Sequence, residues 1–176
     1  MKIYIVRHGN KGEEKDPSLT KKGLKQAKLL AKKLKKIHFD EFYCSNLKRA
    51  KETSEIVSKK IKIKPIIKKS LNEYNPKEIK QNISKWKPEG KMRLKELYKF
   101  LDKILKNPKE DKTILIIAHG ITNRTILSYL MKIDLKKMIP FMQTETGINK
   151  FKYSKKHKSW KVMYWNDSEH LPKKLK

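Results

Sequence analysis

The stretch KIYIVRHGN, residues 2–10, decides how this chain folds. Residues 3–6 are Ile, Tyr, Ile and Val, a short apolar run that predicts a strand buried on both faces. Such a strand normally ends in turn residues, whereas this one ends on Arg7, His8 and Gly9. An arginine and a histidine at the point where a core strand reaches the surface indicate a functional site at that edge of the sheet.

The same arrangement occurs a second time, in TILIIAHG at residues 113–120. An apolar strand again ends in a histidine and a glycine, His119 and Gly120, and residues 121–131 have the pattern of a helix. In open α/β sheets, ligands bind at the carboxyl ends of the strands. We therefore expect the two strand ends to lie together, with the N–H groups at the start of the helix pointing to the same place.

Helices and strands alternate along the rest of the chain. The expected elements are helices at about 20–36, 47–60 and 92–106, strands at 41–44 and 63–67, and a late hairpin formed by 147–154 and 159–166. One short helix carrying Ile79, Ile83 and Trp86 is expected in the irregular middle of the chain. This alternation predicts an α/β fold, a three-layer α/β/α sandwich with a mostly parallel central sheet, built as a single domain over residues 1–176.

The net charge of +28 is carried almost wholly by lysine. The chain has 46 basic residues, of which only four are arginines: Arg7, Arg49, Arg93 and Arg124. The lysines are spread along solvated helix faces, and the sequence has no arginine-rich tract, zinc-finger spacing or RNA-binding motif. We therefore expect no specific nucleic-acid partner, only weak adhesion to polyanions. Because lysine already supplies charge, an arginine indicates a place that needs a planar, bidentate donor.

Two further features concern the setting of the protein. The single cysteine, Cys44, excludes an internal disulfide, fits a reducing compartment and is expected to be a small buried residue. No apolar run approaches the roughly 20 residues of a membrane helix. We expect a cytoplasmic protein without a membrane partner, and the sequence leaves its oligomeric state open.

The residue types at the two strand ends favour an anion as ligand. Two imidazoles, Arg7 and a helix N-terminus that converge on one point would bind a phosphate group. A metal ion is the competing ligand, but the nearby carboxylates lack metal-ligand spacing and Arg7 would repel a cation. The prediction is a phosphate site with no metal and no cofactor.

Five motifs, in order, resemble those of the histidine phosphatase superfamily, which includes the phosphoglycerate mutases. RHGN at 7–10 resembles the Arg-His-Gly signature, and DPSLTKKGLKQA at 16–27 resembles the Leu-Thr-x-x-Gly-x-x-Gln-Ala element. SNLKRAKET at 45–53 is similar to Ser-x-Leu-x-Arg-Ala-x-x-Thr, AHG at 118–120 to the segment of the second histidine, and NDSEHL at 166–171 to a tail of short members. The resemblance covers nearly the whole chain and implies a phosphoglycerate mutase-like sandwich.

This resemblance implies roles for the site residues. His8 is implied as the nucleophile that accepts the phosphoryl group and becomes phosphohistidine. Arg7, Arg49 and His119 are implied as a clamp on the phosphoryl oxygens. This clamp would stabilise the charge that develops on those oxygens during in-line transfer. The expected phosphate ligands are Arg7, Arg49, His119, Asn10 and Gly120.

The resemblance also places an acid shortly after the third strand, where SLNEYNP contains Glu73. The leaving alkoxide needs a proton, so Glu73 is implied as the proton donor and as the base for hydrolysis of the phosphohistidine, with a surface glutamate as the alternative. A donor at neutral pH needs a raised pKa, although the nearby positive charges lower it.

Other residues near the motifs have open or structural interpretations. Arg124 follows His119 by little more than one helical turn, and either contacts the substrate or forms an internal ion pair. Arg93 is interpreted as structural. Capping and close packing are the roles expected of Thr20, Gly23 and Gln26.

The chain departs from the family pattern where substrate contacts and the lid usually lie. The segment 74–92 is short and rich in lysine, so we expect a reduced lid at about 72–90. Tyr74 and Trp86 either cover the pocket or pack in the core. We expect a metal-independent phosphatase that hydrolyses a small phosphomonoester. The alternatives are phosphoglycerate mutase-type phosphoryl transfer and a polyanion-binding member without catalysis.

Overall fold

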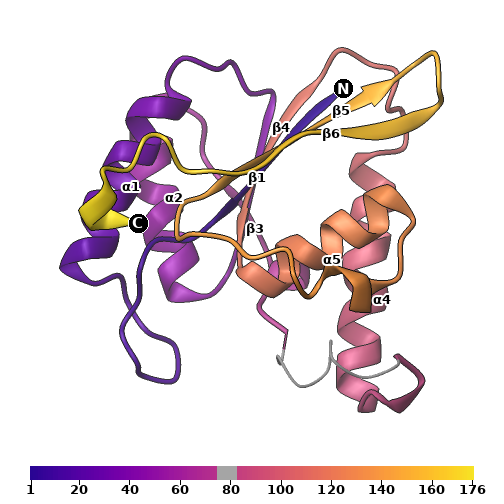
Figure 1. The fold of residues 1–176 in the computed structure, drawn as a ribbon, viewed down its shortest axis with the longest axis horizontal. Coiled ribbons are helices and arrows are strands. Elements are labelled where there is room, and N and C mark those ends of the chain that lie inside the picture. The colour runs from indigo at the N-terminus through magenta and orange to yellow at the C-terminus, as the bar shows by residue number, and fades with distance from the viewer. Residues whose placement is uncertain (75–82) are drawn as a thin grey trace.

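The structure is a computed structural model of residues 1–176, and it describes all of them except 75–82 (Figure 1). The helices are α1 (Lys21–Leu34), α2 (Lys48–Ile61), α4 (Pro88–Ile104) and α5 (Gly120–Met131). The strands are β1 (Lys2–Arg7), β2 (Glu41–Ser45), β3 (Ile66–Lys68), β4 (Thr113–Ala118), β5 (Ile148–Ser154) and β6 (Ser159–Asp167). Short 3-10 turns occur at Lys69–Leu71, Ile83–Lys85, Leu135–Met138 and Lys173–Leu175.

The strands form a single sheet in the order β3-β2-β4-β1-β5-β6. The pairs β1–β4, β2–β4 and β2–β3 are parallel, and β5 and β6 add an antiparallel hairpin at the edge beyond β1. This confirms the expected mostly parallel sheet and the late hairpin. The two strands with the histidine ends, β1 and β4, are direct neighbours, with Arg7 opposite Ala118.

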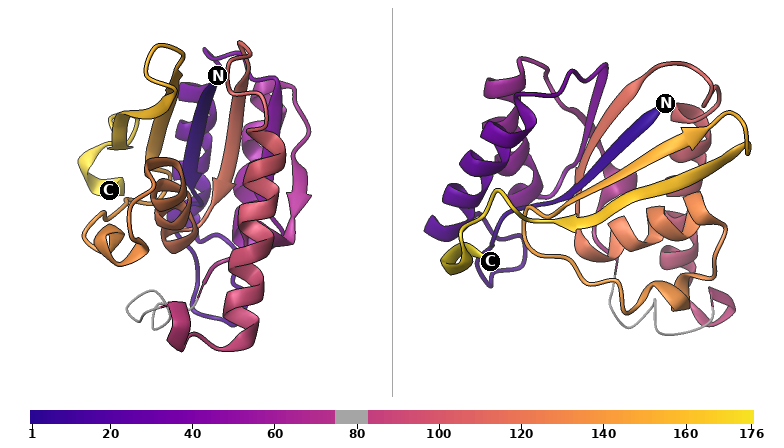
Figure 2. Two further views of the ribbon diagram at one scale, coloured as in Figure 1. Left: turned by 90° about the vertical axis from the view of Figure 1, so that its right-hand side faces the viewer. Right: turned by 45° about the horizontal axis from the view of Figure 1, so that its top comes forward.

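Helices cover both faces of the sheet, as Figures 1 and 2 show. Alternate residues of β1 point to opposite faces. Tyr4 and Val6 belong to the hydrophobic cluster that contains Leu30 of α1 and Val57 of α2. Ile3 and Ile5 belong to the cluster that contains residues of α4 and α5. The fold is therefore the predicted three-layer α/β/α sandwich, and β1 is buried on both faces.

Two predicted boundaries were wrong for local reasons. The strand expected at 63–67 is shorter and later, at Ile66–Lys68, because Pro65 has no N–H group for a ladder hydrogen bond. The helix expected at 92–106 begins four residues earlier, with Pro88 in its first turn, where a missing N–H costs nothing. Pro88 therefore starts this helix and does not break it.

The expected lid segment lies partly outside the described residues, which omit Ile79 and the rest of 75–82. At its two ends, Tyr74 and Trp86 are buried, with 2% and 3% of their surface exposed. Both belong to the core cluster beside α4, and their ring centroids are 6.2 Å apart. Packing in the core is therefore the interpretation that holds for these two side chains.

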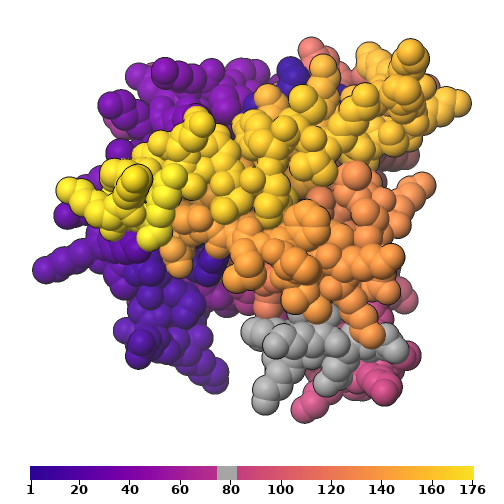
Figure 3. All heavy atoms as spheres, viewed as in Figure 1, coloured from indigo at the N-terminus to yellow at the C-terminus, as the bar shows by residue number. Residues whose placement is uncertain are grey.

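The C-terminal residues lie against the N-terminal part of the chain, as the contact of yellow and indigo atoms in Figure 3 shows. The Gln26 amide donates a hydrogen bond to the carbonyl of Leu175 (2.7 Å), and Lys33 lies 3.7 Å from the carboxylate of Asp167. Cys44 is a buried free thiol, as expected. None of the helices in the described part of the chain combines the length and the apolar character that crossing a membrane requires.

Candidate active site

The ends of β1 and β4 bring the two predicted histidines together. The N–H group of His8 donates to the carbonyl of Ala118 (3.0 Å), which holds the residue after β1 beside the end of β4. The imidazole centroids of His8 and His119 are 5.0 Å apart. Both rings are buried, with exposed fractions of 2% and 0%. The expectation that these two strand ends meet is therefore met.

The hydrogen bonds of His8 determine which ring nitrogen carries hydrogen. Nδ1 lies 2.7 Å from the carbonyl oxygen of Gly9, and the Nε of Arg49 donates to Nε2 at 3.1 Å. Nδ1 is therefore the protonated nitrogen, and Nε2 presents its lone pair. Burial, and then the charges of Arg49 and Arg7, lower the pKa of His8 to about 3. The ring is neutral at physiological pH, which is the state that a nucleophile requires.

Arg49 reaches this point from the first turn of α2 and is only 6% exposed. One of its terminal nitrogens lies 3.6 Å from the carboxylate of Asp16. The same carboxylate oxygen accepts the N–H group of Lys48 (3.0 Å) and so caps α2, whose N-cap residue Leu47 has no side-chain cap. Asp16 therefore holds both the helix start and the arginine that the helix carries.

Arg7 is the last residue of β1 and directly precedes His8. It donates to the carbonyl of Gln143 (2.5 Å) and lies 3.7 Å from Glu145. Its Nε atom is buried without a hydrogen-bond partner in the described structure. About a quarter of the side chain (28%) is exposed, so Arg7 is more accessible to solvent than the two buried imidazoles. The two arginines thus approach the nucleophile from separate elements.

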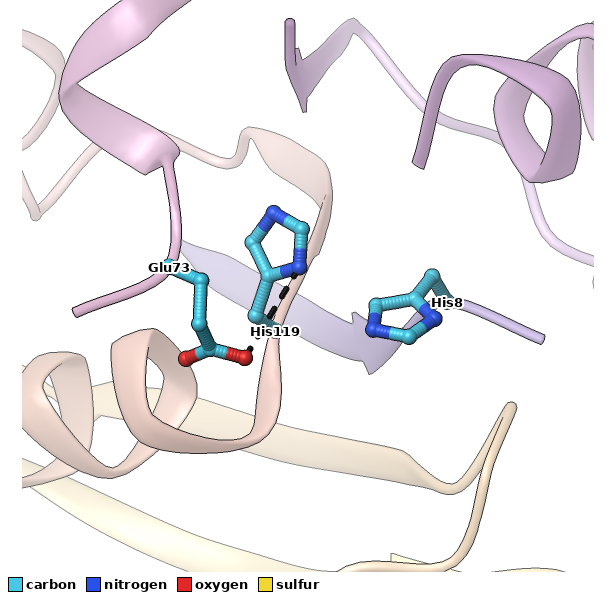
Figure 4. Close-up of side chains that lie close together, drawn as sticks. All are labelled: His8, Glu73 and His119. Atoms are coloured by element: carbon cyan, nitrogen blue, oxygen red, sulfur yellow. Dashed lines mark ion pairs between the residues drawn. The ribbon is translucent and has the colours of Figure 1, made fainter. Parts of the chain in front are cut away.

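Glu73 and His119 face each other, with His8 on the other side of His119 (Figure 4). Glu73 Oε2 lies 3.8 Å from Nδ1 of His119, and Oε1 accepts the N–H group of Ile121 at the start of α5 (3.1 Å). Arg93 donates to the backbone carbonyl of Glu73 (3.1 Å), in agreement with its structural interpretation. Burial raises the pKa of Glu73, although the Ile121 bond and both arginines of the site lower it.

The remaining predicted ligands, Asn10 and Gly120, are placed less directly. The Asn10 side chain accepts the hydroxyl of Thr20 (2.6 Å). Gly120 begins α5, and a Cβ added to it would lie 3.6 Å from Arg7 Nε. Of the N–H groups at this helix start, that of Ile121 goes to Glu73. Contacts of Asn10 and Gly120 with phosphate remain predictions.

The second motif has the structural role expected of it. Thr20 caps α1 by accepting the N–H group of Gly23, and Gln26 accepts the N–H group of Asn10 (2.7 Å). A Cβ at Gly23 would lie 2.0 Å from the carbonyl oxygen of Asn10, so only glycine allows this approach. The motif therefore holds α1 against the loop that follows His8.

Arg124 donates to two backbone carbonyls, those of Gly120 (3.2 Å) and Ile139 (2.7 Å). An internal ion pair was one of the two interpretations of Arg124, but no carboxylate of the described residues lies within 4 Å of its guanidinium group. The guanidinium joins the first turn of α5 to the segment after Leu135–Met138.

Within the described residues, His8, Glu73 and His119 form the one group of side chains with the donor types of a metal site. Their ligand atoms lie within 4.8 Å of one another, whereas ligands of one zinc ion are roughly 3.3 Å apart. The Nε of Arg49 already donates to Nε2 of His8. The arrangement therefore fits an anion better than a cation, and the absence of a metal requirement remains a prediction.

Several residues that hold the site were not predicted from the sequence. The Ser45 hydroxyl is hydrogen-bonded to both His119 and Asn72. Arg7 is held by the carbonyl of Gln143 and the carboxylate of Glu145. Ser45 stands in the third motif and Asn72 directly precedes Glu73, so their positions offered a signal. The segment containing Gln143 and Glu145 carries no pattern that points to the site.

Acid is expected to unfold this protein, because both site histidines are buried as neutral rings. In the unfolded chain each takes up a proton below about pH 6.5. In the folded protein the pKa of His8 is about 3, and burial lowers that of His119 well below its ordinary value. The unfolded state therefore binds more protons, and each histidine lowers the free energy of unfolding by about 1.4 kcal/mol per pH unit below that point. Urea titrations at several pH values measure this slope.

Glu73 acts in the opposite sense. Its pKa is raised in the folded state, so the folded protein binds this proton more readily, and part of the loss in the free energy of unfolding at low pH is offset. His119→Gln is expected to flatten the slope, since glutamine does not titrate. Equal slopes for His119→Gln and the wild type would contradict the neutral burial of His119.

Comparison with known proteins agrees with this geometry. The serine/threonine-protein phosphatase Pgam5, mitochondrial, of Drosophila yakuba is 30% identical over 134 residues, 67% of this chain and 46% of that protein. This chain therefore spans about half the length of that relative. Phosphoserine phosphatase 1 of Hydrogenobacter thermophilus is 27% identical over 172 residues, 80% of this chain and 81% of the relative.

Solved structures share the fold. A mutant phosphoserine phosphatase from Entamoeba histolytica, in complex with phosphoserine, superimposes with a TM-score of 0.77 over 97% of this chain and 99% of that one, at 21% identity. The family model of the histidine phosphatase superfamily (branch 1) matches residues 3–89 and 89–168. These ranges include the opening signature and both histidines. The chain belongs to the histidine phosphatase superfamily.

Proposed function

We propose that this protein is a metal-independent phosphatase that hydrolyses a small phosphomonoester through a phosphohistidine on His8. One observation carries the proposal. The lone pair of His8 Nε2 lies among two guanidinium groups, a second imidazole and a carboxyl group with a raised pKa. Such a set supplies a nucleophile, a clamp for the phosphoryl charge and a proton donor.

In the first step, Nε2 of His8 attacks phosphorus and the bond from phosphorus to the ester oxygen breaks. Arg49 gives up its bond to Nε2 and donates to a phosphoryl oxygen, with Arg7 as the second cationic donor. The leaving alkoxide takes the proton of Glu73. Because Oε1 of Glu73 accepts the Ile121 N–H group, that proton sits on Oε2.

In the second step, water attacks phosphorus and the bond from phosphorus to Nε2 breaks. Glu73, now ionised, takes a proton from the attacking water. Inorganic phosphate leaves, and His8 returns to its neutral form with hydrogen on Nδ1. The hydrogen bond from Nδ1 to the Gly9 carbonyl holds the ring in one orientation through both steps.

The substrate class is proposed from the site and from the relatives. Phosphoserine phosphatases occur among both the curated relatives and the similar structures, and one of those structures holds 3-phosphoglyceric acid. A small phosphomonoester with a second charged group is therefore the first class to try.

A panel of phosphomonoesters, assayed in buffer with a chelator, is expected to release inorganic phosphate at the rate seen without the chelator. The reason is that the arginines, not a metal ion, stabilise the phosphoryl charge. Quenched reactions are expected to contain a phosphoenzyme that is labile in acid and stable in base. Loss of activity on chelation, restored by one metal ion, would contradict the metal-independent mechanism.

The same assay separates the alternatives. With 3-phosphoglycerate, a phosphatase releases free phosphate, whereas a mutase forms 2-phosphoglycerate. A polyanion-binding member without catalysis would release neither product. Its function would be lost on charge reversal of surface lysines and retained in His8→Ala.

A further inference from the structure

A chain of hydrogen bonds behind His119 determines where the hydrogen of this ring lies. The N–H group of Asn46 donates to Oδ1 of Asn72 (3.2 Å), so that atom is an acceptor. The Ser45 hydroxyl oxygen lies 2.8 Å from the same atom. Two oxygens at this distance need a hydrogen between them, and the amide oxygen carries none. Ser45 therefore donates its one hydrogen to Asn72.

Having donated that hydrogen, the Ser45 oxygen can only accept. It accepts the N–H group of Leu47 (3.2 Å), and it lies 2.8 Å from Nε2 of His119. Nε2 must therefore carry hydrogen and donate to Ser45. In the neutral ring, Nδ1 is then left with a lone pair.

Nδ1 of His119 is fully buried, and it has no hydrogen-bond partner in the described structure. The carboxyl group of Glu73, at 3.8 Å, is too distant for a hydrogen bond. The charged and titratable groups that face the ring are Arg7 at the end of β1, His8 directly after it, Arg49 from α2, and Glu73. Burial, His8 and the two arginines lower the pKa of His119, which keeps the free ring neutral.

This geometry has a consequence for a bound phosphoryl group. A phosphoryl oxygen offers only lone pairs, and two lone pairs that face each other repel unless a hydrogen lies between them. The dianion is also the negative partner that the buried ring otherwise lacks, so its arrival favours the imidazolium. A proton from solvent that binds Nδ1 would turn His119 into a donor to the phosphoryl group. The proton leaves again when phosphate departs.

We propose that Ser45 and Asn72 hold neutral His119 with its hydrogen on Nε2, so that Nδ1 takes up one proton when a phosphoryl dianion binds. The inference rests on the proposed function in its second half, because it assumes that His119 meets the phosphoryl group. Ser45 and Asn72 are positioning residues, since they touch His119 and not the substrate.

Nitrogen NMR of the imidazoles tests both halves. The chain has only five histidines, and protonated and unprotonated ring nitrogens give separate ¹⁵N resonances. His119 is assigned by the signals that disappear in His119→Gln. The probes are sulfate, which carries no proton near neutral pH, and inorganic phosphate. In the free protein we expect the Nε2–H form of His119, and with saturating sulfate we expect hydrogen on both nitrogens.

Ser45→Ala is expected to mix the two neutral forms of His119 and to lower kcat/KM about 10- to 100-fold. Ser45→Thr keeps the hydroxyl and is expected to restore the single form. The matched control is Thr125→Val in α5. It removes a fully buried hydroxyl whose one hydrogen bond among the described residues goes to the Ile121 carbonyl (3.0 Å). This control is expected to change neither the His119 resonances nor kcat/KM.

Three results would overturn the inference. An Nδ1–H ring in the free wild type, or an unchanged ring form in Ser45→Ala, removes the role of Ser45 and Asn72. A bound sulfate that leaves His119 neutral removes the proton uptake. If neither anion moves the resonances of His8 or His119, the proposed phosphate site is wrong. The position of the hydrogen on His119 in the free protein is measured without substrate, so that half of the inference is tested separately.

Discussion

His8→Ala is expected to lower kcat at least about 10⁴-fold and to abolish the phosphoenzyme. The imidazole supplies the attacking lone pair, and the side chains that surround it offer no equivalent group at that position. Its Nδ1 hydrogen bond to Gly9 (2.7 Å) aims Nε2, and the low pKa keeps that atom unprotonated. The measurement is the label retained on the protein from a ³²P-labelled substrate, together with steady-state turnover.

The exposed His157 gives a matched control, and His157→Ala is expected to retain full labelling and turnover. Phosphate binding is expected to persist in His8→Ala, because the arginines remain. Mapping of the labelled peptide excludes the other buried ring, since His119 lies in a different segment. A labelled His119, or turnover within tenfold of the wild type, would contradict the assignment of His8 as nucleophile.

Arg49→Lys is expected to lower kcat/KM about 10²- to 10³-fold, although the charge is unchanged. The guanidinium donates to His8 Nε2 through Nε and lies beside Asp16 through a terminal nitrogen, so two separate donors are used at once. A lysine ammonium is a point charge and cannot keep both positions. The loss is expected mainly in kcat, because the donor that leaves Nε2 is needed most in the transition state.

A lysine-arginine exchange on the same helix serves as the control for this variant. Lys51 is exposed on α2, and Lys51→Arg is expected to leave kcat and KM unchanged. Thermal unfolding of both variants verifies that the helix is intact. If Arg49→Lys retained more than a fifth of the wild-type kcat/KM, the arginine would be acting through its charge alone.

The central strands and the two histidines were predictable because their signals are local. A strand buried on both faces must be a short, uninterrupted apolar run, and residues 3–6 and 114–117 both have this pattern. Arg49 was predicted for a different reason. The resemblance of SNLKRAKET to the third family motif implied its role, and the scarcity of arginine in a lysine-rich chain agreed with it. The predicted starts of β3 and α4 were wrong because proline acts differently in the two elements. In a strand its missing N–H group removes a ladder hydrogen bond, whereas in the first turn of a helix that group is not needed.

The raised pKa of Glu73 illustrates what a linear pattern leaves undecided. Burial raises it, and Arg49, Arg7 and the Ile121 N–H group lower it, so its direction depends on distances and on solvent access. The same holds for the two imidazoles, whose hydrogens are placed by Gly9, Ser45 and Asn72. Ser45, at the end of β2, and Asn72 are 27 residues apart in the chain and meet only in the folded protein.

By itself, the sequence determined which residues lie at the ends of β1 and β4, because apolar runs and the residues that end them are neighbours along the chain. Only the tertiary structure decided the protonation and orientation of those residues. Desolvation and hydrogen bonding act over less than about 4 Å, and the atoms that exert them on His8, Glu73 and His119 come from segments far apart in the sequence.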